Sequence, residues 1–383
     1  MNLCPFYVVA VMPPGRRREV TSAAKQTRLP MPHVSTVLFS PPRTTAPRES
    51  DPMPTYYRGP VSDHFDGKRF FGPVRSGRKS LSQLLRWRLG GKRAVWPRNV
   101  DNPDPDPVQA QADPGTVRVT MIGHVSRLIQ LEGVNLLVDP VWSERASPMA
   151  FAGPRRVRKP GLAIDDLPPI DLVLVSHNHY DYLDLKTLRT LVDYHDPVIV
   201  TPLGNDVIIR AAAPRARTVA LDWDERTDWH HLSVTAVPVQ HWSARGVRDR
   251  NAALWAGFVL NWSEHAVIIA GDTGFGAGWW ARRARREDRA FDLAILPIGA
   301  YEPRWFMEDA HMMPEEAVAS FDLLKARHAL GCRFGTFNLT DEPVEEPLQR
   351  LERELHRRGI DGARFRTLKP GEAWTIPLPV APT

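Results

Sequence analysis

The sequence predicts an α/β protein in which a mixed system of β-sheets is covered by helices and preceded by an N-terminal arm. Two observations support this prediction: short apolar runs typical of β-strands dominate from Thr116 onward, and helical patterns interrupt them. The early runs alternate as hairpins do, whereas the later runs are almost continuously apolar, as strands buried on both faces are. We expect one large domain over residues 116–383.

The region before this domain divides into two predicted parts. Residues 1–54 are rich in Pro, Arg, Ser and Thr without sustained periodicity, so we expect a disordered leader or an over-extended start to the reading frame. Residues 55–115 are expected to form an arm packed on or beside the main domain. The opening MNLCPFYVVAVM has no preceding basic residues and no small-residue cleavage signal, so we do not expect a signal peptide.

One helix is predicted within the arm, in the segment SLSQLLRWRLGG. Its leucines, Leu81, Leu84, Leu85 and Leu89, follow helical spacing, with arginines and a tryptophan between them. Such a helix either lies on a membrane surface or packs on its own domain. The second interpretation is favoured, because short amphipathic helices usually cover a core.

Charge is unevenly distributed along the chain. Residues 1–100 carry 18 Lys and Arg against 5 Asp and Glu, a net charge of +13, which leaves −7 for the remainder of a chain whose total is +6. The basic part suits either nucleic acid or an anionic membrane surface as a partner. The acidic remainder would repel a polyanion, so we expect no nucleic-acid partner.

The cysteine content and the apolar runs bear on location. Cys4 and Cys332 leave no room for a disulfide framework, which fits a reducing compartment. No apolar run approaches the ~18 residues of a membrane span. The default expectation is a cytoplasmic protein, with membrane contact at most peripheral, and a homo-oligomer is compatible with the sequence.

The predicted strands and helices follow in order from Thr116. The strand-like runs are TVRVTMIG (116–123), RLIQL (127–131), VNLLVDP (134–140), DLVLVS (171–176), PVIVTP (197–202), LSVTAVPV (232–239), LWAGFVLNW (254–262), AVIIAGD (266–272) and LAILPIG (293–299). Helical patterns are LDLKTLRTLVDY (183–194) and PEEAVASFDLLKARH (314–328), the latter opening with Pro314 and two glutamates as helix starts do.

A metal motif follows the strand DLVLV. His177 and His179, two residues apart in the loop HNHYD, can converge on one ion, and Asp181 can face a neighbouring ion or a bound water. Imidazole and carboxylate suit zinc, and also manganese or iron. Taken alone, two histidines in a loop are equally compatible with polar side chains exposed at the surface.

Three further residues of ligand type follow other strand-like runs. His241 follows VTAVPVQ, Asp272 ends AVIIAGD, and His311 follows LAILPIGAYEPRWF. A core histidine and a turn aspartate would explain His241 and Asp272 singly. Four strand ends that all lead to ligand-type residues instead predict one metal site.

These motifs, together with the Gly123–His124 pair, the LVDP containing Asp139, GDTGF, PIGAYEPRWF and GTF, resemble the metallo-β-lactamase superfold. Within it, the sequence resembles the N-acylphosphatidylethanolamine-hydrolysing phospholipase D family, whose members are zinc-dependent phosphodiesterases. The resemblance spans residues 56–383 and is most specific over 117–343. It implies a four-layer αββα sandwich with the N-terminal arm outside it.

The resemblance also implies the metal ligands. A first ion would be held by His177, His179 and His241. Asp272 would bridge this ion and a second one, and Asp181 would bind the second ion. At the two other positions where the family has histidine, this sequence has Tyr182 and Arg333.

These two substitutions favour a site with one tightly bound zinc. Two carboxylates without histidine bind a transition metal weakly, and the guanidinium of Arg333 would repel it. We therefore expect Arg333 to replace part of the missing charge. Two alternatives remain open. In the first, Cys332 or His328 supplies a ligand; Cys332 and Arg333 point to opposite sides of an extended strand, so at most one of these two faces the metal. In the second, the chain is a metal-binding scaffold without activity.

The resemblance implies hydrolysis of a glycerophospholipid phosphodiester that releases phosphatidic acid, and the expected mechanism uses metal-activated hydroxide. Asp181 and Asp272 would orient the hydroxide or accept its proton, and His311 would protonate the leaving oxygen. Arg333 would stabilise the developing negative charge. The alternative substrate is a small soluble ester, lactone or phosphodiester.

Other residues are expected to support the site. His124 and Asp139 would orient ligands. Tyr182 either adds a hydrogen bond or fills the space of a lost ligand, and filling is favoured. Aromatic side chains suited either to an acyl pocket or to a core are Trp242, Trp255, Tyr301, Trp305 and Phe306.

Overall fold

Two seven-stranded sheets form the centre of the protein within the residues that the computed structural model describes, which are 55–74, 79–91, 93–285 and 290–379. The predicted leader, residues 1–54, lies outside them. The first sheet has the order β14-β1-β2-β3-β4-β5-β6 and the second the order β13-β12-β11-β10-β9-β8-β7.

The first sheet is antiparallel at one side and parallel at the other. β14, β1, β2 and β3 pair antiparallel, and β3, β4, β5 and β6 pair parallel. The strands are β1 (Thr116–Gly123), β2 (Ser126–Leu131), β3 (Val134–Val138), β4 (Leu172–Leu174), β5 (Val198–Pro202), β6 (Arg217–Leu221) and β14 (Ala373–Pro377).

The second sheet repeats this arrangement. β7, β8, β9 and β10 pair antiparallel, and β10, β11, β12 and β13 pair parallel. The strands are β7 (Arg226–Trp229), β8 (Leu232–Val237), β9 (Gly257–Trp262), β10 (His265–Ile269), β11 (Leu293–Pro297), β12 (His328–Cys332) and β13 (Phe365–Thr367). In both sheets, the carboxyl ends of neighbouring parallel strands therefore meet at one edge.

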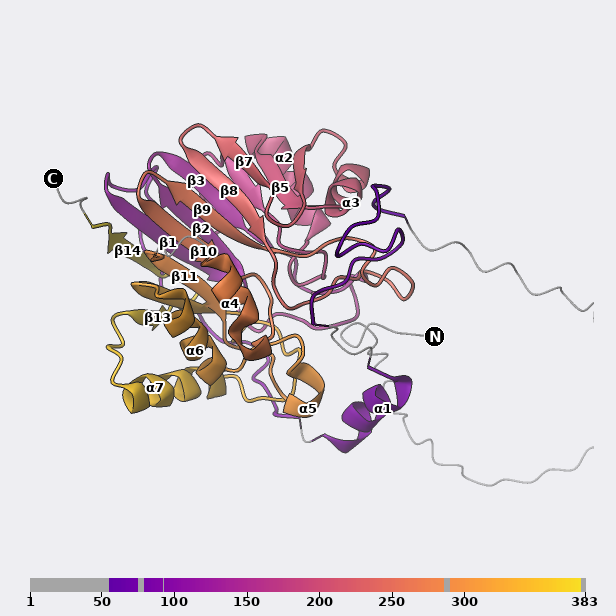
Figure 1. The fold of residues 1–383 in the computed structure, drawn as a ribbon. Helices are drawn as coiled ribbons and strands as arrows, with labels where there is room; N and C mark the ends of the chain where they lie inside the picture. Colours follow the sequence, from indigo (N-terminus) through magenta and orange to yellow (C-terminus); the bar gives the residue numbers. More distant parts are fainter. Residues whose placement is uncertain (1–54, 75–78, 92, 286–289, 380–383) are drawn as a thin grey trace, which may run out of the picture.

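Helices cover the outer faces of the sheets and complete four layers (Figure 1). α2 (Leu185–His195) and α3 (Asn205–Ala212) cover the first sheet, where Leu188 and Ile209 join the same buried cluster as Val173. α4 (Trp279–Ala284) and α6 (Pro314–Leu324) cover the second, with Phe321 in one cluster with Ile268, and α7 (Glu346–Arg358) packs beside α6. The predicted αββα sandwich is confirmed.

The core between the sheets explains the apolar runs of the sequence. Side chains of the first sheet such as Val119, Leu136 and Leu174 share one buried cluster with side chains of the second sheet such as Phe258 and Ile295. The opposite faces of the same strands pack against the helices, so the parallel strands are buried on both sides. This double burial is why they read as nearly continuous apolar runs.

The arm is attached to the sandwich through α1 (Leu81–Gly90), which lies beside the short helix α5 (Arg304–Met307) in Figure 1. Trp87 is buried, stacks on Phe306 with 4.8 Å between ring centroids, and donates from Nε1 to Oδ2 of Asp341 at 2.8 Å. Leu85 and Leu89 on the same helix are 50% and 84% exposed. One side of the helix therefore packs on the domain, and another leaves two leucines uncovered.

None of the described helices is long and apolar enough to span a bilayer.

Candidate metal centre

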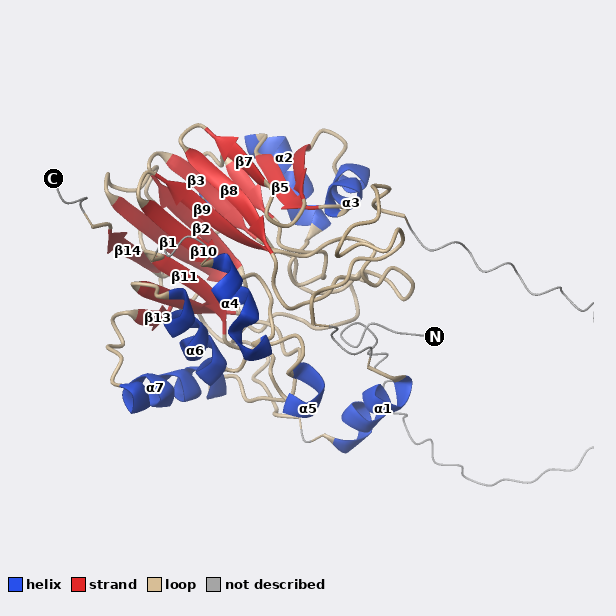
Figure 2. Cartoon of the chain, in the orientation of Figure 1, coloured by secondary structure: helices blue, strands red, loops and turns tan. Residues whose placement is uncertain are grey.

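The candidate site lies beyond the carboxyl ends of the parallel strands, where the loops gather at one end of the sheets (Figure 2). The loop after β4 carries His177 and His179, and the loops after β8 and β10 carry His241 and Asp272. All four side chains are buried, and one ligand-type atom from each lies within 4.8 Å of the others. The sandwich therefore assembles the donor group that the strand ends predict.

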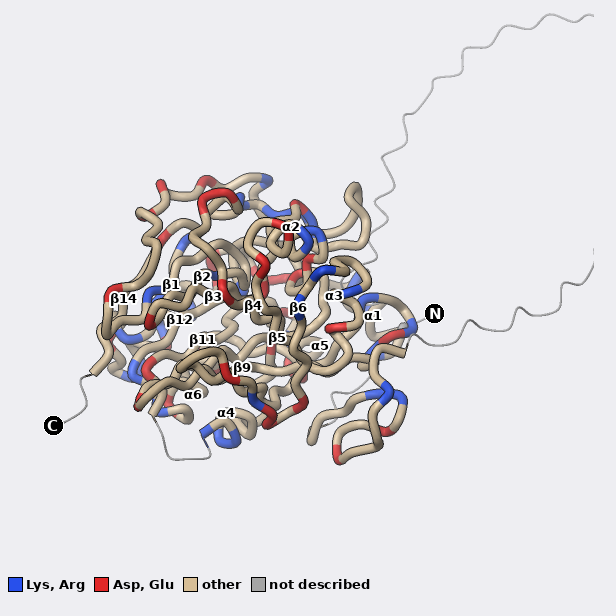
Figure 3. Tube along the Cα trace, turned by 90° about the horizontal axis from the view of Figure 1, so that it is seen from above, with Lys and Arg blue, Asp and Glu red and all other residues tan. Residues whose placement is uncertain are grey.

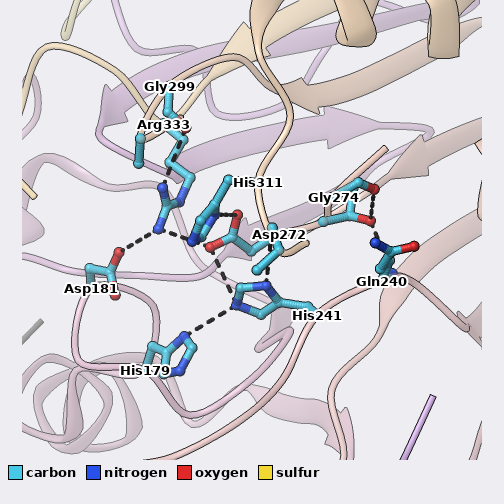
Figure 4. A network of polar contacts seen from close by, with 12 residues as sticks. His179, Asp181, Gln240, His241, Asp272, Gly274, Gly299, His311 and Arg333 are labelled. Atoms are coloured by element: carbon cyan, nitrogen blue, oxygen red, sulfur yellow. Dashed lines mark hydrogen bonds and ion pairs between the residues drawn. The ribbon is translucent and has the colours of Figure 1, made fainter. Parts of the chain in front are cut away.

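The imidazole nitrogens of this group lie unusually close together. Nε2 of His177 is 2.8 Å from Nδ1 of His179. Figure 4 shows the second contact with this atom, from Nε2 of His241 at 3.3 Å. Nδ1 of His241 donates to the carbonyl oxygen of Ala310 at 3.1 Å, which leaves the lone pair on Nε2. This nitrogen is the one that faces the group.

All three histidines are neutral at pH 7. Burial lowers the pKa of His177 and His179 well below the usual value, and the charges of neighbouring histidines lower it further. Burial also lowers the pKa of His241, to about 3. A metal binds only the unprotonated imidazole, so these groups are ready to coordinate without first losing a proton.

The carboxylate of Asp272 completes the donor group. Burial would raise its pKa, but Arg333, His311 and His241 together hold that pKa well below the usual value. Its Oδ2 lies 3.5 Å from Nε2 of His241 and forms an ion pair with Nη2 of Arg333 at 2.9 Å. A buried, ionised carboxylate beside three neutral imidazoles fits a divalent transition metal.

Beside the four donors lies an ion-pair network centred on Arg333. Its Nη2 is 2.9 Å from Oδ2 of Asp272 and 3.5 Å from Oδ2 of Asp181 (Figure 4). Its Nε donates to the hydroxyl of Tyr182 at 2.9 Å. Tyr182 thus makes a hydrogen bond and does not only fill space, which corrects the favoured interpretation of this residue.

Asp181 stands outside the four-donor group. Its Oδ2 is 3.1 Å from Nε2 of His124 as well as facing Arg333. Burial would raise its pKa, but the hydrogen bond from His124 and the charge of Arg333 lower the pKa to about 2. Asp181 is therefore an anion held by two neighbouring side chains.

The conformation of Arg333 differs from the extended one assumed from the sequence. β12 ends at Cys332, and Arg333 has φ = 67°, in the left-handed region that costs a non-glycine residue free energy. Its backbone N–H donates to the carbonyl oxygen of His124 at 2.9 Å. This turn directs the guanidinium to the two carboxylates.

The alternative ligands are not brought to the site. The thiol of Cys332 belongs to the core between the sheets. His328 lies at the start of β12, where its ring contacts Trp374 with 5.5 Å between centroids. Neither residue joins the donor group, so the alternative in which Cys332 or His328 supplies a ligand is wrong.

The remaining residues predicted for the site also lie at this edge of the sheets. His311 contacts Oδ1 of Asp272 through Nδ1 at 3.0 Å, and Asp139 accepts through Oδ1 from the backbone N–H of Ser176 at 2.7 Å, which fixes the start of the histidine loop. Burial raises the pKa of Asp139 to about 7. Like Arg333, His124 and Asp139 have positive φ values, 54° and 42°, so strained backbone is concentrated at this edge.

The predicted aromatic residues are dispersed. The ring of Trp242 lies 4.3 Å from that of His179, between centroids. Tyr301 is buried and donates from its hydroxyl to Glu346 on α7 at 3.0 Å, whereas Trp305 on α5 is 37% exposed and stacks on Arg86. Among these aromatic side chains, Trp242 contacts a donor of the metal group.

Two residues that position the site were missed in the sequence. Asp184 caps α2 by accepting from the N–H groups of Lys186 and Thr187, and its other oxygen accepts from the N–H of Ser143 at 2.9 Å. An aspartate just before a helical pattern is a recognisable cap signal. Gly299 lies so close to Arg333 that a Cβ would overlap its carbonyl oxygen, and no local signal reveals this long-range requirement.

Comparisons with known proteins agree with this geometry. The profile of the beta-lactamase superfamily domain matches residues 134–332. The chain is 36% identical over 266 residues to N-acyl-phosphatidylethanolamine-hydrolyzing phospholipase D 1 of Caenorhabditis elegans, covering 67% of this chain and 74% of that protein. It is 28% identical to a metal-dependent hydrolase of Methanopyrus kandleri, covering 67% of this chain and 99% of that protein.

The fold is also similar to that of solved structures. A protein described as a possible metal-dependent hydrolase from Veillonella parvula superposes with a TM-score of 0.55 at 16% identity, covering 69% of this chain and all of that one (100%). The matching profile and the alignment with the nematode protein show that the chain belongs to the β-lactamase superfamily, as a metal-dependent hydrolase with the metallo-β-lactamase fold.

Proposed function

We propose that the chain is a phospholipase D-type phosphodiesterase that hydrolyses N-acylphosphatidylethanolamine-like glycerophospholipids, with zinc as its metal. The observation that carries the proposal is the buried group of three neutral imidazoles and one carboxylate with a guanidinium beside it. Three nitrogens and one oxygen form a ligand set that zinc prefers. The name of the nematode relative supplies the substrate class.

The metal and the side chains have separate tasks in this reaction. A bound zinc would supply Lewis acidity toward a phosphoryl oxygen and a coordinated water of lowered pKa. His177, His179, His241 and Asp272 would hold it. Water attacks phosphorus, the bond from phosphorus to the head-group oxygen breaks, and phosphatidic acid and an N-acylethanolamine leave.

His311 is the residue placed to move the proton. Because Asp272 accepts from its Nδ1 at 3.0 Å, Nε2 is the nitrogen that exchanges a proton. Burial lowers the pKa of His311, so the ring is neutral at pH 7 and first accepts a proton from the attacking water. It then donates that proton to the leaving alcohol oxygen, and the protons balance.

A lipid substrate requires access to a membrane, and α1 offers a surface for it. The exposed Leu85 and Leu89 alternate with Arg86 and Arg88, and the helix carries no acidic residue. Figure 3 shows the basic positions of α1 in blue. Apolar and cationic side chains on one helix match the interface of an anionic bilayer.

Turnover of two substrates tests the proposal. Zinc-loaded protein is given vesicles containing N-acylphosphatidylethanolamine and, separately, the soluble diester bis(4-nitrophenyl) phosphate. We expect phosphatidic acid from the vesicles, with His241→Ala as the inactive variant and His265→Ala, a histidine paired with Asp292 outside the donor group, as the matched control. Hydrolysis of the soluble diester alone would contradict the lipid substrate. Failure on both would contradict a phosphodiesterase and favour a scaffold.

A further inference from the structure

The side chain of Arg333 places a buried cation in the half of the site that faces Asp181. The guanidinium of Arg333 is 3% exposed, and the two carboxylates it faces, Asp181 and Asp272, are 3% and 1% exposed. One nitrogen, Nη2, approaches both carboxylates, at 2.9 Å from Asp272 and 3.5 Å from Asp181. A cation that bridges two buried carboxylates has the position that a divalent ion would need in order to bind them both.

The guanidinium is fixed at several points. Nε donates to the hydroxyl of Tyr182 at 2.9 Å, and Nη1 lies 3.4 Å from the carbonyl oxygen of Gly299, within hydrogen-bond distance. The backbone N–H is bonded to His124, and the absence of a side chain at Gly299 lets the two backbone segments touch. Arg333 therefore has little freedom to swing away and admit an ion.

The other residues around this half offer little to a second metal. Asp181 is engaged by His124 at 3.1 Å as well as by Arg333. The ring of Tyr182 packs on that of His177, with 4.2 Å between centroids, so it fills the adjacent volume. His124 contacts Asp181 at 3.1 Å and His311 contacts Asp272 at 3.0 Å, but among the described residues neither imidazole belongs to the group of four donor atoms that lie within 4.8 Å of one another.

We propose that this chain binds one divalent ion, at His177, His179, His241 and Asp272, and that Arg333, positioned by Tyr182, permanently takes the place of a second cation. The guanidinium balances the two carboxylates and presents a fixed positive charge beside the reacting phosphoryl group. This inference deepens the proposed function through its metal site and does not depend on the lipid substrate.

Metal stoichiometry tests the proposal independently of activity. Purified full-length protein is saturated with zinc, dialysed against buffer with submicromolar free zinc, and measured by inductively coupled plasma mass spectrometry. We expect one zinc per chain, and one transition in the absorption spectrum during titration with Co²⁺. Two zinc ions of comparable affinity per chain would overturn the proposal, whether or not any substrate is hydrolysed.

A double variant tests the assigned residues. Arg333→His combined with Tyr182→His removes the cation and supplies two imidazoles next to Asp181, so we expect a second zinc to bind at least tenfold more tightly than it binds the natural chain. The matched control is Arg350→His, which removes an arginine that pairs with Glu315 on the helical layer, and it should retain one zinc. A folded double variant, judged by circular dichroism, that still binds one zinc would refute the role of Arg333 and Tyr182. If the double variant does not fold, the stoichiometry of the natural chain decides alone.

Discussion

The Nε atom of Arg333 donates to the hydroxyl of Tyr182 across 2.9 Å in the buried interior of the site. We predict that Tyr182→Phe lowers the free energy of unfolding by about 1–3 kcal/mol, because a buried charged donor loses its partner. Urea denaturation measures this change. Tyr180→Phe on the same loop, whose ring packs under Arg245, is the control and should shift unfolding less. An unaltered midpoint in Tyr182→Phe would mean that the bond contributes nothing to stability.

Gly299 and Arg333 touch through their backbones. We predict that Gly299→Ala displaces the Arg333 segment, since the new Cβ would overlap its carbonyl oxygen, and lowers stability by at least ~1–3 kcal/mol. Thermal unfolding reports the loss. Gly362→Ala, where nothing lies within 4 Å of an added Cβ, should leave the midpoint within a degree or two. Equal midpoints for the two variants would show that the close approach is easily relieved.

His241 presents Nε2 to the donor group. We predict that His241→Ala weakens zinc binding by at least about 100-fold, because a direct ligand matters more than the outer partners whose loss costs about 10–100-fold. Competition with a chromophoric chelator gives the affinity. His265→Ala, which removes a half-buried imidazole at the opposite end of β10, should bind zinc as the natural chain does. Retention of affinity in His241→Ala would remove this residue from the ligand set.

The stability of the metal-free chain should depend on pH through its buried histidines. Burial lowers their pKa values, to about 3 for His241. Below the ordinary histidine pKa of about 6.5, the unfolded chain therefore binds more protons than the folded chain. Stability is thus fully present above about pH 6.5 and is lost as pH falls toward 3, by up to ~1.4 kcal/mol per unit for each histidine. Asp139 is a single group that acts in the opposite direction. Because burial raises its pKa to about 7, its contribution to stability increases as the pH falls over the same range.

Denaturation midpoints in chelator between pH 7.5 and 4.5 measure this slope. His241→Phe should reduce it, because one buried group no longer takes up a proton on unfolding. A midpoint that rises as pH falls would contradict the assignment of neutral histidines.

The uncovered leucines of α1 should bind membranes. We predict that Leu85→Ser with Leu89→Ser reduces the vesicle-bound fraction, with the partition coefficient falling roughly tenfold or more, as expected when two apolar side chains no longer enter the bilayer. Sedimentation with vesicles containing anionic lipid gives the coefficient. Tyr194→Ser, which changes a 69% exposed residue of α2, is the control. Equal sedimentation of both variants would show that α1 is not the contact.

The sequence predicted most strands inside the sheets but missed edge strands such as β7, and also β12. Apolar runs such as those of β3 and β10 are recognisable because both faces of these strands are buried. β7, with the sequence RTDW, has alternating exposed and half-buried residues at the edge of its sheet and carries no such signal. β12, HALGC, lacks β-branched residues, and its strand conformation depends on its neighbours β11 and β13.

The candidate site was predicted in part for a similar reason. His177, His179, His241 and Asp272 directly follow recognisable strands, so their convergence could be inferred from topology. The bond between Tyr182 and Arg333 joins residues 151 positions apart and depends on a left-handed turn at Arg333, which no local pattern indicates. The close approach of Gly299 is hidden for the same reason.

The pairing of β14 with β1 has a consequence for how the chain is made. Thr116 lies opposite Pro377, so the outer edge of β1 cannot be covered until nearly the whole domain has left the ribosome. During synthesis, that unpaired edge is open to other chains. Slow elongation or removal of residues 373–377 would therefore favour co-translational aggregation, even though every residue of the metal centre had already been made.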